Sequence, residues 1–139
     1  MTGIGAVYLA VLAVIVPHTS SEPGRVPLAL DAALDRIPAG TPVFNDYVMG
    51  AWIAWRHPDL QQYIDGSATP YTAEHYADFH RAETASPGWY AVVRQSGAPY
   101  ALVEEGGPLA TGLLGRGWTT LGSDEGYLLL QRPGPLDLR

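Results

Sequence analysis

The 139-residue chain has enough apolar side chains for one folded domain, since 47% of its residues are hydrophobic. Its formal net charge is −6, and its 8 basic residues, all of them arginine, are scattered singly along the sequence. A protein that tracks a nucleic acid backbone needs clustered positive charge, so we expect no nucleic acid partner. The absence of cysteine excludes disulfides, thiolate nucleophiles and cysteine metal sites.

An unbroken apolar run without any charge extends from Gly3 to Val16. As a helix this run would be about 21 Å long, which is shorter than the hydrocarbon core of a bilayer at about 30 Å. No Lys or Arg precedes it, as a secretory signal peptide would require. We therefore expect residues 1–16 to be the end of a truncated transmembrane helix. An atypical signal anchor and a buried core helix are the alternatives. A polar linker follows at 17–26.

Residues 27–132 have the pattern of a soluble folded domain, and residues 133–139 that of a loose tail. Apolar residues at helical spacing predict a short helix after Pro27. Further along, predicted strands lie at 43–44, 61–64 and 99–103, predicted helices at 47–56, from 73 onward, at 89–95 and at 109–114, and a predicted hairpin at 118–121 and 127–131. This order predicts an α/β fold with a small, mostly parallel sheet, helices on its faces and a C-terminal β-hairpin.

Two of the predicted helices carry aromatic side chains at helical spacing. In the helix at 47–56, Val48, Trp52 and Trp55 share one face, so we expect them to be core residues and not a platform for stacking sugars. Thr72 is a good N-cap for the following helix, whose Tyr76 and Phe79 we expect to point inward.

Two predicted strands end in polar loops, one at Asn45-Asp46 and the other at Asp65-Gly66. Ligands of α/β proteins usually bind at strand ends, which makes Asn45, Asp46 and Asp65 candidate ligand-binding residues. Two carboxylates held close together can act as general acid and base or hold a metal. Short polar residues at strand ends also accept backbone hydrogen bonds, and we prefer this structural interpretation, with no catalytic residue.

Other residues with chemical potential lack the spacing that function requires. His75 and His80 are five positions apart and miss the i, i+4 spacing of two metal ligands on one helix face. Ser67 is not part of a Gly-x-Ser-x-Gly turn that would expose a hydrolase nucleophile. We therefore expect no metal site and no cofactor.

Several motifs between residues 27 and 132 occur in an order that resembles a known family. They are Val43-Phe44-Asn45-Asp46-Tyr47 to Gly50-Ala51-Trp52, Tyr63-Ile64-Asp65-Gly66 with Tyr71, Gly88-Trp89, Pro99 to Val103, Leu109 and Trp118. This set is similar to the C-terminal soluble domain of bacterial multi-spanning C-type glycosyltransferases. Two positions depart from that family's pattern, since Ser67 replaces an Arg and Ala51 replaces a second glycine.

The resemblance implies a parent enzyme embedded in the membrane that uses a polyprenyl-phosphate sugar donor, with its catalytic acid in a loop near the first transmembrane helices. It also implies that the soluble domain follows the last transmembrane helix outside the cytoplasm, in agreement with the apolar residues 1–16, and it adds Tyr71 to the candidate ligand-binding residues.

We therefore expect a non-catalytic extracytoplasmic domain of a membrane glycosyltransferase-like protein that aids acceptor or partner recognition. Its expected partners are the lipid bilayer, through residues 1–16, and a polyprenyl-linked sugar or glycan acceptor, through the missing membrane part. The alternatives are a free-standing membrane-anchored binding module and a small α/β enzyme that uses Asp46 and Asp65.

Overall fold

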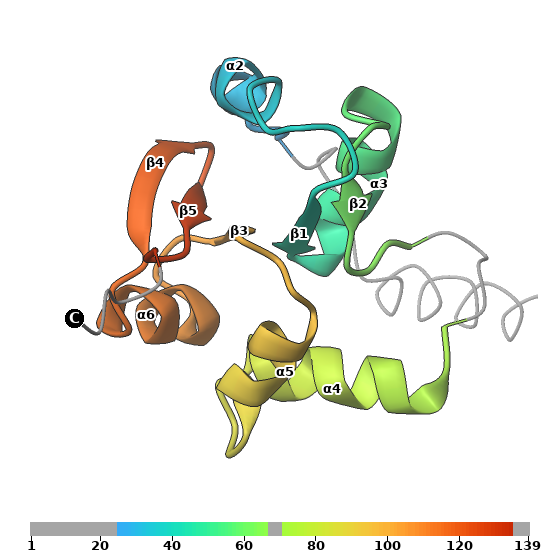
Figure 1. Ribbon diagram of the computed structural model, residues 1–139, viewed down its shortest axis with the longest axis vertical. Helices are drawn as coiled ribbons and strands as arrows, with labels where there is room; N and C mark the ends of the chain where they lie inside the picture. The colour runs from blue at the N-terminus through green and yellow to red at the C-terminus, as the bar shows by residue number, and fades with distance from the viewer. Residues whose placement is uncertain (1–24, 67–70, 135–139) are drawn as a thin grey trace, which may run out of the picture.

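The structure of the protein, a computed structural model, describes residues 25–66 and 71–134. Within these residues five strands form one sheet in the order β2-β1-β3-β5-β4 (Figure 1). Strand β1 pairs in parallel with β2 and β3, whereas β5 pairs antiparallel with β3 and β4. The strands are β1 (Pro42–Asn45), β2 (Gln61–Gln62), β3 (Tyr100–Glu104), β4 (Thr119–Asp124) and β5 (Tyr127–Gln131).

The α/β fold and the C-terminal hairpin are confirmed, but the sheet is mixed and not mostly parallel. Strand β5 pairs with β3 along its whole length, whereas β2 pairs with β1 only at Gln61 and Gln62. The hairpin turns tightly because Glu125 and Gly126 both adopt positive φ, at 48° and 81°. Such a turn brings β4 and β5 together without a long crossover, and antiparallel pairing follows from it.

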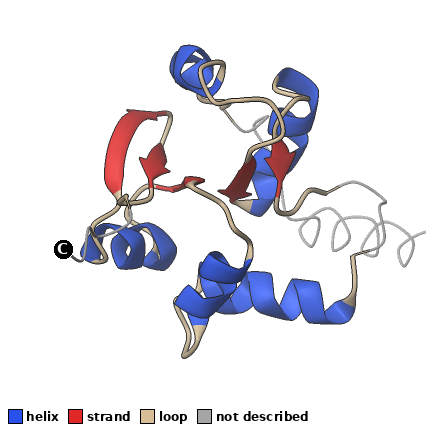
Figure 2. Ribbon diagram, in the orientation of Figure 1, coloured by secondary structure: helices blue, strands red, loops and turns tan. Residues whose placement is uncertain are grey.

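Helices cover both faces of the sheet, as Figure 2 shows. One face carries η1 (Leu28–Leu30), α2 (Asp31–Leu34) and α3 (Tyr47–Arg56), and the other carries α4 (Ala73–Glu83), α5 (Trp89–Gln95) and α6 (Pro108–Gly115). Neighbouring residues of the central strand divide between the two cores, since Leu102 packs toward α3 while Ala101 and Val103 pack toward α5 and α6. The domain therefore has three layers, and its two helical sides are separated by the sheet.

Helix α3 does not present the face that its sequence pattern predicts. Met49, Trp52 and Ile53 form its buried stripe, whereas Val48 is 59% exposed and Trp55 is 78% exposed. The prediction that Val48 and Trp55 are core residues is therefore wrong. The physical reason is that α3 is apolar on all sides, so helical spacing alone does not reveal which stripe meets the sheet.

Helix α4 begins where its sequence predicts, because the Thr72 hydroxyl accepts a hydrogen bond from the His75 N–H at 3.1 Å. Phe79 is buried as expected, but Tyr76 is 41% exposed, which corrects its inward assignment. In the described part of the chain no helix is both long and apolar enough to cross a bilayer. The predicted transmembrane end at residues 1–16 lies outside the described residues.

Candidate functional site

Asn45, the last residue of β1, is fully buried and joins two strands. Its amide nitrogen donates to the carbonyl oxygens of Ile64, at 2.7 Å, and Asp46, at 2.8 Å. Its amide oxygen accepts a hydrogen bond from the Tyr63 N–H at 2.7 Å. The side chain therefore continues the pairing of β1 with the segment after β2, in the place of backbone groups.

Asp46 is the N-cap of α3, and its Oδ1 accepts a hydrogen bond from the Val48 N–H at 2.8 Å. Its own N–H donates to the Leu102 carbonyl of β3 at 2.9 Å. These two bonds fix the turn from strand to helix and satisfy a backbone donor at the start of the helix. Gly50, one turn later, lets α3 lie directly on the loop after β2, because an added Cβ would come 2.0 Å from the Ile64 oxygen.

Asp65 and Tyr71 lie together at the edge of the sheet near β2. Asp65 is only 6% exposed and accepts a hydrogen bond from the Gln62 amide nitrogen at 2.9 Å. The pKa of the Tyr71 phenol is raised, first by burial and then by the negative charge of Asp65. The structure thus brings Asn45, Asp65 and Tyr71 into one neighbourhood, whereas Asp46 lines a separate cavity.

An aromatic column, absent from the sequence-based expectations, links α4 to this edge of the sheet. The Tyr71 ring stacks on His75 with centroids 4.8 Å apart, and His75 lies 4.4 Å from the Tyr63 ring. Tyr63 in turn stacks on Phe44 at 4.3 Å. Nε2 of His75 also lies 2.8 Å from the Tyr63 carbonyl oxygen. The column gives Tyr71 and His75 a role in docking α4.

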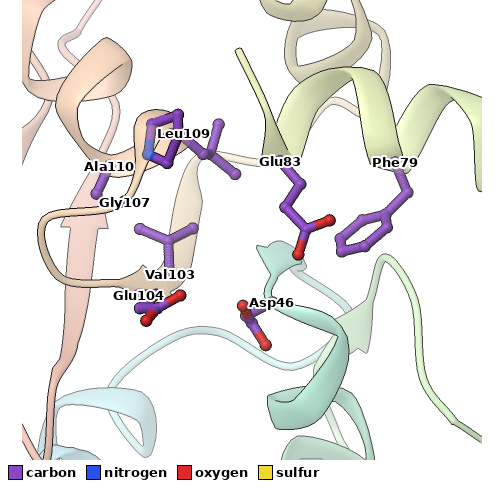
Figure 3. Close-up of a pocket in the computed structure, with 9 residues that line it drawn as sticks. Asp46, Phe79, Glu83, Val103, Glu104, Gly107, Leu109 and Ala110 are labelled. Carbon is purple, nitrogen blue, oxygen red and sulfur yellow. The ribbon is translucent and has the colours of Figure 1, made fainter. Parts of the chain in front are cut away.

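A small cavity of about 50 Å³ opens at the carboxyl ends of β1 and β3. The carboxylates of Asp46, Glu83 and Glu104 point into the same space (Figure 3). The pKa of nearby Tyr127 is raised by burial and then by the charges of Asp46 and Glu104. Ligand pockets usually enclose roughly 300–1,000 Å³, so this cavity is too small for a substrate.

Among the described residues no group of His, Cys, Asp and Glu is arranged to hold a metal ion.

His57, at the end of α3, is a buried polar residue whose contacts the sequence did not predict. Its Nε2 lies 2.8 Å from Asp31 Oδ1, and its Nδ1 lies 3.1 Å from Asp35 Oδ1. Both ring nitrogens are thus within hydrogen-bond distance of a carboxylate. This His57 clamp ties α2 to α3. The sequence carries one signal of this clamp. Asp31 and Asp35 are four positions apart on one predicted helix, so their carboxylates lie on the same helix face.

Arg56 completes the clamp, since its Nε and Nη2 both lie 2.9 Å from Asp31 Oδ2. Burial acts to raise the pKa of Asp31, but hydrogen bonds from Arg56 and His57, with their positive charges, hold that pKa below its ordinary value. The four side chains of the clamp, Asp31, Asp35, Arg56 and His57, are paired with one another, which makes the clamp a structural feature of the fold.

The hydrogen bonds therefore assign structural roles to Asn45 and Asp46, and Asp65 and Tyr71 lie packed together at the edge of the sheet near β2.

The chain matches no protein-family model, no curated protein and no solved structure.

Proposed function

We propose that this domain is the non-catalytic, extracytoplasmic part of a membrane glycosyltransferase-like protein, and that it rests on the membrane surface through α3. The observation that carries the proposal is the outer α3 face, formed by Tyr47, Val48, Ala51 and Trp55. All four residues are exposed, with Trp55 at 78% and Val48 at 59%. Such a continuous apolar helix face is typical of a surface that another apolar phase covers.

The chemistry of the outer α3 face favours a bilayer as that phase. Trp55 and Tyr47 are amphipathic aromatics, which concentrate at the boundary between lipid and water. No charged residue lies between Tyr47 and Trp55, and Arg56 beside them is engaged with Asp31. The whole chain carries a net charge of −6, so attraction to anionic lipid does not drive the contact.

The apolar run at Gly3–Val16 supports the same placement. Residues 17–24 separate this run from the described domain, and an extended chain of that length spans about 28 Å at most. If the run lies in the bilayer, the domain stays close to the membrane surface. There it meets lipid-linked sugars and glycan acceptors that a membrane-embedded partner handles.

The hydrogen bonds of the strand-end residues support a non-catalytic domain. Both ends of the Asn45 amide are used to join strands, and Asp46 caps α3. A general acid or base needs its polar atoms directed at a substrate, and the cavity that Asp46 lines is too small for one. The ordered motifs named above support the glycosyltransferase-like parent.

Single-cysteine labelling tests the membrane placement, because the chain has no cysteine of its own. Two variants of the full chain, Val48→Cys and Thr111→Cys, are each labelled at the new cysteine with a polarity-sensitive dye. Both are then bound to phosphatidylcholine vesicles. Thr111 is exposed on α6, across the sheet from α3, and serves as the matched control. We expect a shift to an apolar environment at Val48 alone, unchanged by salt. An aqueous environment at Val48 in vesicle-bound chains would overturn the placement.

The reading frame upstream of the Met1 codon tests the parent protein. We expect it to continue and to encode many transmembrane segments. A stop codon directly upstream would count against a multi-spanning parent and leave the membrane contact of α3 to be judged by the labelling experiment.

A further inference from the structure

An open hollow of about 530 Å³ lies on the side of the sheet opposite α3, between the turn before α5, α5 itself and the end of α6. Its walls include two aromatic side chains, Trp89 and Tyr90, and two arginines, Arg94 and Arg116. No carboxylate is among the described residues that line it. In a chain with a net charge of −6, this arg-aromatic hollow is a local region of positive charge.

The wall of the arg-aromatic hollow is held in place by its own packing. The Arg116 guanidinium lies over the Tyr90 ring at 4.1 Å from its centroid and at 5.4 Å from that of Trp89. Trp89 presses on Gly112, where an added Cβ would come 2.7 Å from the indole. The Trp118 indole N–H donates to the Tyr90 hydroxyl at 3.4 Å. The aromatic faces and the Arg116 side chain are therefore positioned before any ligand arrives.

The two arginines of the arg-aromatic hollow keep their donors for a ligand. Arg25, Arg56 and Arg81 form ion pairs with carboxylates, but over residues 25–66 and 71–134 no ion pair involves Arg94 or Arg116. A guanidinium stacked on a ring still presents its N–H edge, which matches the two oxygens of a carboxylate or a phosphate.

We propose that the arg-aromatic hollow binds a small aromatic anion. Arg116 and Arg94 hold its carboxylate or phosphate, and its flat ring lies against Trp89. The volume falls within the range of about 300–1,000 Å³ that small-molecule sites occupy. The proposal does not depend on the membrane contact of α3, since the two surfaces lie on opposite sides of the sheet.

The test is a titration of the full chain with benzoate and with phenyl phosphate, followed through the indole NMR signal of Trp89. Benzyl alcohol, which has the ring without the charge, is the ligand control. We expect both anions to give a saturable shift and benzyl alcohol to give none. The tighter of the two anions identifies carboxylate or phosphate as the preferred group. A shift of equal size with benzyl alcohol, or the absence of saturation with both anions, would overturn the proposal.

Variants then assign the charge contacts. Arg94→Gln and Arg116→Gln should each weaken binding about tenfold or more, because each removes a hydrogen bond between charged groups. Arg132→Gln is the matched control, since Arg132 is an exposed arginine that does not line the hollow. Arg94 stacks on no ring in the described residues, so its variant reports binding even if Arg116→Gln disturbs the packing. Equal loss in Arg132→Gln would show a general charge effect and overturn the proposal.

Discussion

Replacing His57 by leucine removes the two contacts that His57 makes in the clamp, with Asp31 and Asp35, and puts an apolar side chain of similar size in its place. The His57 side chain is 4% exposed, and it forms a 2.8 Å hydrogen bond to Asp31, whose lowered pKa keeps the carboxylate charged. Loss of such a bond costs about 1.5–3 kcal/mol. Asp35 is 69% exposed on its side chain, so solvent screens the second bond, which adds at most about 1 kcal/mol. We therefore expect His57→Leu to lower the free energy of unfolding by about 1.5–4 kcal/mol.

Urea unfolding followed by tryptophan fluorescence measures this change. A loss of about 1.5–4 kcal/mol corresponds to a midpoint shift of about 0.8–2 M for typical urea slopes of about 2 kcal/mol per M. His80→Leu is the matched control, because His80 is a 75% exposed histidine that faces Glu83 at 3.7 Å. We expect this control to stay within about 0.5 kcal/mol of the native chain. Equal midpoints for the two variants would refute the assignment of the clamp as a stabilising element.

Three further predictions follow from single residues. Gly50→Ala should cost about 3 kcal/mol in urea unfolding, because its Cβ would meet the Ile64 oxygen, whereas Gly115→Ala, with nothing within 4 Å, should not destabilise. Thr72→Ala should cost about 1 kcal/mol in the same assay by removing the cap of α4. The depressed pKa of Asp31 keeps it ionised in the folded state while the unfolded chain takes up a proton, so stability should fall as the pH drops below its ordinary pKa of 3.8. Asp31→Asn should flatten that fall below about pH 4, and an unchanged acid profile would contradict this cause.

Much of the fold was predictable because its boundaries depend on local signals. Pro108 at the first turn of α6, Thr72 at the cap of α4 and Gly88 before α5 each act within a few residues, and all three elements lie where the sequence predicts. Asp46 belongs to the same class, since its capping bond to Val48 spans two residues. Caps and turn residues of this kind act on the backbone of their immediate neighbours, so they can be recognised from a few consecutive residues.

The features that were missed depend on contacts between distant segments. The His57 clamp joins residues separated by more than twenty positions, and the aromatic column joins Phe44 to His75 through Tyr63. The exposed face of α3 was missed because Trp52 and Trp55 have the same apolar character and only the sheet distinguishes them. The parallel character of the sheet was overestimated because strand length and partner order depend on tertiary pairing.

The contact of the outer α3 face with a bilayer is tested most directly by quenching of Trp55 fluorescence in vesicles of brominated phosphatidylcholine that carry the full chain. Trp52 and Trp118 are buried, at 6% and 2% exposed, whereas Trp55 is 78% exposed. The difference between the native chain and a Trp55→Phe variant therefore isolates this residue. We expect brominated lipid to quench a component of the native emission that is absent in Trp55→Phe. Equal quenching of the two proteins would contradict the membrane contact of α3.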